Sequence, residues 1–272
     1  MLGAIIGDII GSRWEFNRTN DYNFPLFSPY NGFTDDTICT IAVADALLEG
    51  RDFGESLHDW CRRHPVAKGG YGGGFRRWIQ SDNPRPYGSY GNGSAMRVSP
   101  VGWWFDDADD VLKYARLSAE CTHNHPEGIK GAQAVAIAIA DCRRMRRNFN
   151  VRNLTPKDIL RYGLSRAVDC LDLPGGPENF SIDLDRYRNV FDETCQGTVP
   201  PALWIVMHSK SYEDAVRRAV SLGADADTIG DIAGAIAEAI WGIPEWIKLR
   251  GMAYLSPEMK DVLSRFRRRV TA

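Results

Sequence analysis

The stretch Leu2-Gly3-Ala4-Ile5-Ile6-Gly7-Asp8-Ile9-Ile10-Gly11 places a glycine at every fourth position of an otherwise apolar segment. Residues four apart lie on one face of a helix, so these glycines would form a ridge without side chains. Glycine inside a helix costs about 1 kcal/mol relative to alanine, and such a ridge therefore indicates close approach to another backbone. A second segment, residues 228–241, carries its own small residues at Gly230, Ala233, Gly234 and Ala237. We expect these two helices to pack against each other.

Most of the remaining sequence also has a helical period. We expect helices over residues 38–48, 132–147, 155–171, 200–208 and 228–241, and further helices that begin near Ser211 and Ser256. Convincing alternating strands are absent, and no repeat or linker divides the chain. Two segments, residues 69–100 and 172–197, lack a helical pattern and are predicted to be long loops. The sequence therefore predicts an all-α fold, a single compact domain over residues 1–272.

Composition excludes several classes of protein. The chain has 272 residues, of which 44% are hydrophobic and 25% charged, as in ordinary globular domains. With 33 Lys and Arg against 35 Asp and Glu, the net charge of −2 does not favour bulk binding to nucleic acid or to an anionic membrane. The six cysteines are widely spaced, without zinc-ligand spacing, and are expected to be reduced thiols. Without a secretory signal or a membrane-spanning stretch, the sequence predicts a cytoplasmic protein.

Two groups of acids each precede an apolar helix. The first acidic motif is Thr34-Asp35-Asp36-Thr37, and the second is Asp225-Ala226-Asp227-Thr228. Thr and Asp are preferred helix N-caps, and carboxylates at a helix start are stabilised by the helix dipole. One cap, however, needs only one side chain, and here doubled carboxylates flanked by threonines occur twice. The alternative to capping is a cation site.

A hard divalent cation suits these residue types. Mg²⁺ and Mn²⁺ prefer oxygen ligands, whereas zinc prefers nitrogen and sulfur. Gathering four carboxylates without a cation is unfavourable because like charges repel. If the first helix continues to Glu15, Asp8 and Glu15 lie seven residues apart and face the same side. The alternatives are an exposed glutamate at a helix end and a buried aspartate that only accepts hydrogen bonds.

Two further segments are candidates for ligand binding. Gly91-Asn92-Gly93-Ser94-Ala95-Met96-Arg97 has backbone N–H groups that could form an anion nest, although such loops are often plain turns. The glycine-rich run over residues 69–75 is interpreted as a flexible loop rather than a second phosphate site. The His-x-His of residues 122–125 could bind metal, but such a pair is more often a surface or hydrogen-bonding feature.

Taken together, five segments in this order resemble the ADP-ribosylglycohydrolase family, which includes dinitrogenase-reductase-activating glycohydrolase and the ADP-ribosyl-arginine and ADP-ribosyl-serine hydrolases. These segments are residues 7–15, 33–37, 91–97, 122–123 and 225–228. The resemblance implies an orthogonal helical bundle with two magnesium ions, or manganese in some members. It implies metal ligation by Thr34, Asp35, Asp36, Asp225, Asp227 and Thr228, and catalytic roles for Glu15 and Asp36. It also implies substrate binding by Gly91, Asn92, Gly93, Ser94, Met96 and His123.

The implied activity is hydrolysis of the C1″ glycosidic bond of ADP-ribose on a protein side chain (arginine or serine) or a small acceptor. Its partners would be ADP-ribosylated proteins or small ADP-ribose conjugates. Two alternatives remain: a catalytically silent relative that binds ADP-ribose or is structural, and a dinuclear-metal hydrolase of phosphoesters. The chain departs from the family pattern at Asp231, where a small residue is expected, and it is a short member.

Overall fold

Helices make up the regular secondary structure of the computed structural model, which describes residues 1–147, 155–173 and 179–271. The elements are α1 (Leu2–Gly11), α2 (Asp35–Glu49), α3 (Phe53–Arg63), α4 (Gly73–Gln80), α5 (Gly93–Met96), α6 (Ser99–Trp104), α7 (Ala108–Glu120), α8 (Pro126–Arg147), α10 (Pro156–Gly163), α11 (Ser165–Cys170), η2 (Leu184–Arg186), α12 (Cys195–Met207), α13 (Tyr212–Val220), α14 (Ala226–Trp241), α15 (Glu245–Met252) and α16 (Pro257–Thr271). The all-α prediction is confirmed. None of these helices combines the length and apolar character needed to cross a membrane.

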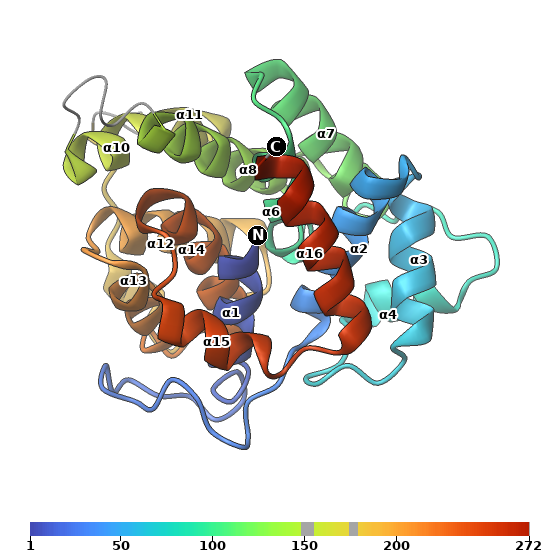
Figure 1. The fold of residues 1–272 in the computed structure, drawn as a ribbon, viewed down its shortest axis with the longest axis horizontal. Helices are drawn as coiled ribbons and strands as arrows, with labels where there is room; N and C mark the ends of the chain where they lie inside the picture. Colours follow the sequence, from blue (N-terminus) through green and yellow to red (C-terminus); the bar gives the residue numbers. More distant parts are fainter. Residues whose placement is uncertain (148–154, 174–178, 272) are drawn as a thin grey trace.

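Helices α1 and α14 lie side by side at the centre of the fold and touch through their backbones (Figure 1). A Cβ atom placed on Gly7 would lie 2.1 Å from the carbonyl oxygen of Gly230, and one on Gly3 would lie 2.4 Å from that of Gly234. The glycine ridges thus remove the side chains that would hold the two helices apart. The prediction that these helices pack together is confirmed, and we call this contact the glycine seam.

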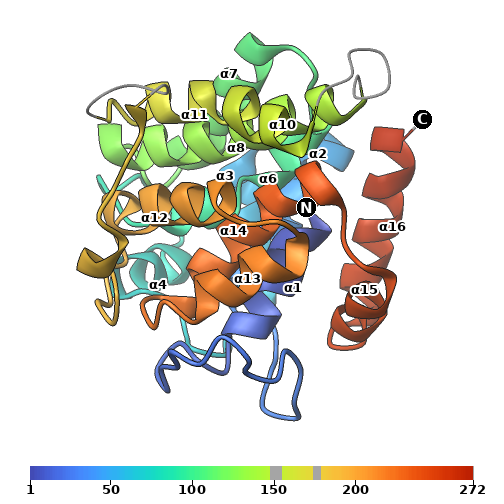
Figure 2. The ribbon, with the colours of Figure 1, turned by 90° about the vertical axis from the view of Figure 1, so that its left-hand side faces the viewer.

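A second layer covers the seam. Helix α8, rich in alanine and isoleucine, is buried along most of its length and packs against α7, α11, α6 and α14. In Figure 2, α8, α10 and α11 run roughly alongside one another, while α16 runs steeply across their ends and packs on α2. The crossing of these layers gives the bundle its orthogonal character.

Some predicted boundaries are wrong. The segment 69–100 is not one loop, because it contains α4 and α5 and the start of α6. The helix predicted over 155–171 is split into α10 and α11 at Leu164, directly after Gly163 packs against Cys142 of α8. Helix α12 begins five residues before the predicted start, because the Thr194 side chain accepts a hydrogen bond from the Gly197 N–H and caps it there.

Helix α1 does not continue to Glu15, so the condition under which Asp8 and Glu15 would share a helix face is not met. It ends at Gly11, where a Cβ would lie 2.3 Å from the Ala226 carbonyl oxygen. The side-chain amide of Asn31 donates to the carbonyls of Ile9 and Ile10, at 2.8 and 3.2 Å. The last carbonyls of α1 therefore have partners without another helical turn.

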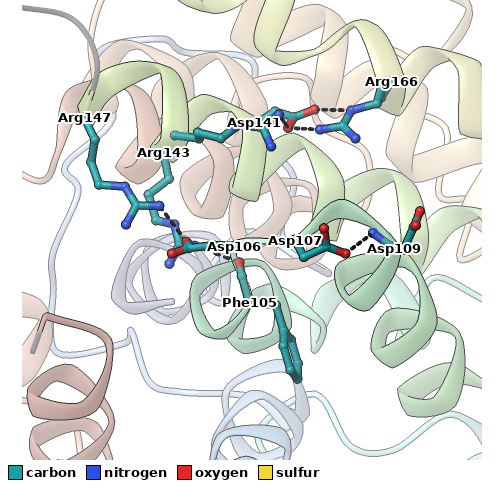
Figure 3. Close-up of polar contacts among 9 residues, drawn as sticks. Phe105, Asp106, Asp107, Asp109, Asp141, Arg143, Arg147 and Arg166 are labelled. Carbon is teal, nitrogen blue, oxygen red and sulfur yellow. Dashed lines mark hydrogen bonds and ion pairs between the residues drawn. The ribbon is translucent and has the colours of Figure 1, made fainter.

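The arginines at the end of α8 form an ion-pair network with two aspartates (Figure 3). This arginine–aspartate cluster comprises Asp106, Asp141, Arg143, Arg144, Arg147 and Arg166. The carboxylate of Asp141 is buried and accepts from Arg144 at 2.7 Å and from Arg166 through both nitrogens of its fork. Arg143 also donates to the carbonyls of Trp103 and Phe105, so the cluster ties α8 to the end of α6 and to α11.

Candidate functional site

The two acidic motifs, 190 residues apart in the sequence, line one pocket of about 240 Å³. Asp35 and Asp36 come from the start of α2, and the second motif comes from the start of α14. The glycine seam joins α14 to α1, whose Asp8 binds the start of α2, so the same packing brings the motifs together. The predicted residues that line this pocket, which we call the acidic pocket, are Glu15, Asp35, Asp36, Gly91, Asn92, Gly93, Met96, His123, Asp225, Asp227 and Thr228.

Helix capping does not explain the four aspartates. In α2 the cap is Thr34, whose side chain accepts from the Asp36 N–H at 3.2 Å. In α14 the N-cap position is held by Asp225, but its side chain makes no capping hydrogen bond. Instead, one of its carboxylate oxygens accepts from the side-chain amide of Asn92, at 2.7 Å. Capping therefore accounts for Thr34 alone.

Asp8 of α1 holds the first acidic motif in place through hydrogen bonds. Its buried carboxylate accepts from the backbone N–H and hydroxyl of Thr34, at 3.0 and 2.9 Å, and from the N–H and hydroxyl of Thr37. These four hydrogen bonds hold the first turn of α2 against α1. The hydroxyl of Thr34 is occupied in this way, and Thr34 is not among the residues that line the acidic pocket.

The charge of this region is not balanced. Burial, followed by the charges of Asp225 and Asp8, raises the pKa of Glu15 to about 7. Burial also raises the pKa of Asp225 to about 6 and that of Asp227 well above its ordinary value, where the nearby carboxylates add to the effect. The pKa values of Asp35 and Asp36 are raised by burial and by Asp8. Carboxylates from three segments thus repel one another in one place.

The donor chemistry of the acidic pocket fits a hard divalent cation. Among the described residues, Oδ2 of Asp36 and Oδ1 of Asp227 are buried and have no hydrogen-bond partner. A buried carboxylate oxygen without a donor is unfavourable, and a cation ligand or a proton would relieve it. In the present side-chain arrangement, no group of three or more His, Cys, Asp or Glu residues in the described part of the chain is placed to hold a metal ion. The residue types match the oxygen preference of Mg²⁺ or Mn²⁺.

Glu15 lies in the turn after α1, beneath a strap of two glycines. A Cβ on Gly69 would lie 2.5 Å from Oε2 of Glu15. Gly69 and Gly70 have φ values of 77° and 90°, in the left-handed region that favours glycine. The backbone of the strap can therefore cover the Glu15 carboxylate closely, which a larger residue in the 69–70 pair would prevent.

The 91–96 loop is the start of a short helix, not an anion nest with left-handed glycines. Neither Gly91 nor Gly93 has a positive φ, and α5 begins at Gly93. A Cβ on Gly93 would lie 3.0 Å from Nε2 of His123, so the glycine gives this ring room. Burial, with the nearby Arg97 guanidinium, lowers the pKa of His123 well below its ordinary value, and the ring is neutral.

Asn92 links this loop to the second acidic motif, because its amide donates to Thr198 as well as to Asp225. Ser94 does not line the acidic pocket. Its buried hydroxyl donates to the Gly128 carbonyl at 2.7 Å and anchors α5 to α8. Any contact of Ser94 with a ligand would therefore use its backbone N–H rather than its hydroxyl.

Several residues that line the acidic pocket were not predicted from the sequence. They are Gly70, Gly72, Gly73, Gly74, Phe75, Tyr87, Ser89, Arg97 and Glu193. The run over residues 69–75, interpreted above as a flexible loop, supplies part of this wall and then starts α4. The pair Gly69-Gly70 was the available signal, since adjacent glycines permit the left-handed backbone seen here.

Comparison with known proteins agrees with this architecture. The family model described as ADP-ribosylglycohydrolase matches residues 1–270. The chain is 26% identical to "ADP-ribosylhydrolase ARH3" of Homo sapiens, over 90% of this chain and 85% of the relative. It is 24% identical to "ADP-ribosylarginine hydrolase Tri1" of Pseudomonas putida (strain GB-1), over 91% and 72% of the two chains.

A solved structure entitled "ADP-ribosylglycohydrolase-related protein complex" has the same fold. It superposes with a TM-score of 0.67 at 24% identity, over 99% of this chain and 97% of that one. The family match over nearly the whole chain is the stronger result. The chain therefore belongs to the ADP-ribosylglycohydrolase family, a family of hydrolases.

Proposed function

We propose that this protein hydrolyses the C1″ glycosidic bond of ADP-ribose attached to a protein side chain or a small acceptor, with two Mg²⁺ ions or with Mn²⁺ as cofactor. The observation that carries the proposal is the meeting of the two acidic motifs and Glu15 in one pocket. One relative is named an ADP-ribosylarginine hydrolase and another an ADP-ribosylhydrolase, and both activities are compatible with an oxygen-lined pocket. Arginine and serine are the protein acceptors we propose.

The acidic motifs would hold the metal ions. Asp35, Asp36, Asp225 and Asp227 supply carboxylates, and Thr228 supplies a hydroxyl. When bound, the ions would supply Lewis acidity and fix the orientation of the ribose hydroxyls. Thr34 would support this set indirectly, because its hydroxyl is held by Asp8 at the start of α2.

Glu15 and Asp36 are the proposed catalytic carboxylates. A carboxylate beside C1″ stabilises the oxocarbenium-like charge that develops as the glycosidic bond breaks. Glu15, with a pKa raised to about 7, is suited to take a proton from the attacking water near neutral pH. The glycine strap over Glu15 limits its contact with bulk water and keeps the carboxylate facing the pocket.

The opposite wall would bind the rest of ADP-ribose. The first N–H groups of α5, at Gly93 and Ser94, lack intrahelical partners as at any helix start and are donors for a phosphate oxygen. Neutral His123, with Gly91, Asn92 and Met96 beside it, would contact the phosphates and the distal ribose. A neutral ring can accept a hydrogen bond from a ribose hydroxyl at one nitrogen, which a charged ring cannot.

The test is release of free ADP-ribose from substrates carrying it on arginine, on serine and on a nucleotide, in the presence of Mg²⁺. We expect release from at least one of them, and loss of release in the Glu15→Ala variant and after chelation. Binding of ADP-ribose in a calorimeter without turnover on any substrate would identify a catalytically silent relative instead. Release of inorganic phosphate in place of ADP-ribose would identify a phosphoester hydrolase.

A further inference from the structure

A second cavity is lined by residues that neighbour Glu15 and the glycine strap in the chain. It has a volume of about 350 Å³ and is lined by Arg13, Asn17, Tyr30 and Lys68. Arg13 and Asn17 flank Glu15 in the same turn, and Lys68 directly precedes the glycine strap that covers Glu15. The backbone of Lys68 also forms a bridge with Thr34, next to the first acidic motif. One wall of this cavity is thus built from the segments that enclose the catalytic carboxylate.

Its two cations lack acidic partners. Within the ranges that the structure describes, neither Arg13 nor Lys68 makes an ion pair or a side-chain hydrogen bond. By contrast, many of the other arginines do, including Arg62, Arg63 and Arg116. The amide of Asn17 also has no hydrogen-bond partner there. Three polar groups of one small cavity therefore have free donors.

Arg13 is nevertheless held in place by aromatic rings, and the stem of Lys68 lies against Gly32. The Arg13 guanidinium carbon lies 4.5 Å from the ring centroid of Trp14 and 5.5 Å from that of Tyr30. Stacking on aromatic faces leaves the N–H edge of a guanidinium free to bind a carboxylate with two hydrogen bonds. The stem of Lys68 crosses Gly32, where a Cβ would lie 3.3 Å from its Cδ. The stacking reduces the entropy that the Arg13 side chain would lose on binding an anion.

We propose that this cavity, the acceptor subsite, binds acidic residues of the polypeptide that carries the ADP-ribose, so that the protein prefers modification sites flanked by Asp or Glu. The proposal rests on the proposed function, because the acceptor leaves from the Glu15 end only if ADP-ribose occupies the acidic pocket. A peptide fits better than a nucleic acid, because the cavity offers only two cations rather than a basic track, and the net charge of the chain is −2.

The experiment uses two peptides of equal length, ADP-ribosylated at the same central residue and prepared as a serine and an arginine series. In one peptide the neighbouring positions are glutamates, and in the other they are lysines. We expect kcat/KM of the Mg²⁺-loaded protein to be about five- to tenfold higher for the acidic peptide, because two charge-assisted contacts are gained near the surface. The difference should appear in KM, since the contacts are made equally before and during the reaction.

Charge reversal separates recognition from structure. The Lys68→Glu variant should abolish the preference, because Arg13 and the new carboxylate cancel, and the Arg13→Glu, Lys68→Glu double variant should reverse it toward the lysine-flanked peptide, which loss of folding could not do. The matched control is Lys113→Glu, an exposed lysine on α7, a helix that lies on the other side of the molecule from the segment that follows α1 in both Figure 1 and Figure 2. This control should keep the wild-type preference.

Binding of fluorescently labelled forms of both peptides, measured by anisotropy, keeps the two proposals distinguishable. Tighter binding of the acidic peptide without hydrolysis of either would support the subsite and contradict the hydrolase. Equal hydrolysis and equal binding of the two peptides would overturn the subsite and leave the hydrolase standing. Unmodified competitors of equal charge, an oligonucleotide and an acidic peptide, are then compared. If the oligonucleotide displaces the labelled acidic peptide more readily than the acidic competitor does, the assignment to polypeptides is overturned.

Discussion

The acidic pocket and the arginine–aspartate cluster both contain buried carboxylates, but only one of them balances its charge. Asp141 is almost fully buried and receives hydrogen bonds from two arginines. Asp36 and Asp227 are equally buried, and each has a carboxylate oxygen with no donor in the described structure. A paired cluster stabilises the fold by itself, whereas an unpaired one is stabilised only when a cation or ligand arrives. Whether a buried carboxylate has a hydrogen-bond donor therefore distinguishes a structural cluster from a candidate functional one more clearly than its degree of burial does.

The largest expected effect comes from neutralising one acid of the pocket. Asp227→Asn should lower kcat by about 10³-fold, because it removes a proposed ligand of the metal ions. The same change should raise the free energy of unfolding of the metal-free protein by about 1 kcal/mol, since it removes a buried charge without a donor. Steady-state hydrolysis and urea unfolding in chelator measure the two effects. Unchanged activity would remove Asp227 from the site.

The matching substitution in the arginine–aspartate cluster should act in the opposite sense. Asp141→Asn leaves Arg144 and Arg166 without a carboxylate and should lower the free energy of unfolding by about 2 kcal/mol. Activity at 25 °C should stay within about twofold of wild type, a change worth less than 0.5 kcal/mol. Urea unfolding and kcat for the two variants, compared side by side, test whether charge balance distinguishes the clusters. A stable but inactive Asp141→Asn protein would contradict this distinction.

The two clusters should also respond oppositely to pH. The pKa values of Glu15 and Asp225 are raised, to about 7 and about 6, so the folded state binds these protons more tightly than the unfolded state does. Their contribution to stability is therefore present at low pH and lost as the pH rises through 6 to 7. The pKa of Asp106 is lowered, mainly by its hydrogen bond from Arg147, so its contribution is lost as the pH falls through the acid range.

Thermal unfolding measures this difference. In chelator, the midpoint temperature should fall by about 5 °C between pH 5.5 and pH 8 through the acidic pocket. Added Mg²⁺ should raise the midpoint more at pH 8 than at pH 5.5, because protons compete with the cation for the same carboxylates. The Asp227→Asn variant should show a smaller response to Mg²⁺. An equal effect of Mg²⁺ at both pH values would contradict the proposed site.

The smallest expected effect concerns Asp231, the departure from the family pattern. Its carboxylate lies on α14, is fully buried, has no donor for either oxygen among the described residues, and does not line the acidic pocket. Burial, followed by the charge of Asp8, raises its pKa. Asp231→Asn should therefore stabilise the protein by about 1 kcal/mol at pH 8, and less at pH 5, while leaving kcat within about twofold. A large loss of activity would extend the functional cluster to this position.

The sequence predicted those parts of the molecule that depend on local spacing. The helical class, the glycine ridges of α1 and α14, and the position of acids at the starts of α2 and α14 all follow from neighbouring residues. The sequence could not decide whether the first helix reaches Glu15, because the last carbonyls of that helix are bound by Asn31, twenty residues beyond its end. The glycine strap and Glu193 join the pocket through contacts between distant segments, and no local pattern records these. Ser94 matched the family motif, yet its hydroxyl is used in packing against α8.

The glycine seam has a consequence for how accurately the pocket is built. Side chains can change rotamer, but the backbones that meet at Gly7 and Gly230 have no such freedom, and their separation is therefore fixed. Asp8 follows Gly7, and the second acidic motif ends two residues before Gly230 at the start of the same helix, so the spacing of the two acidic motifs is set by a contact between backbones. The relative position of the two acidic motifs thus depends on glycines, which have no side-chain chemistry of their own.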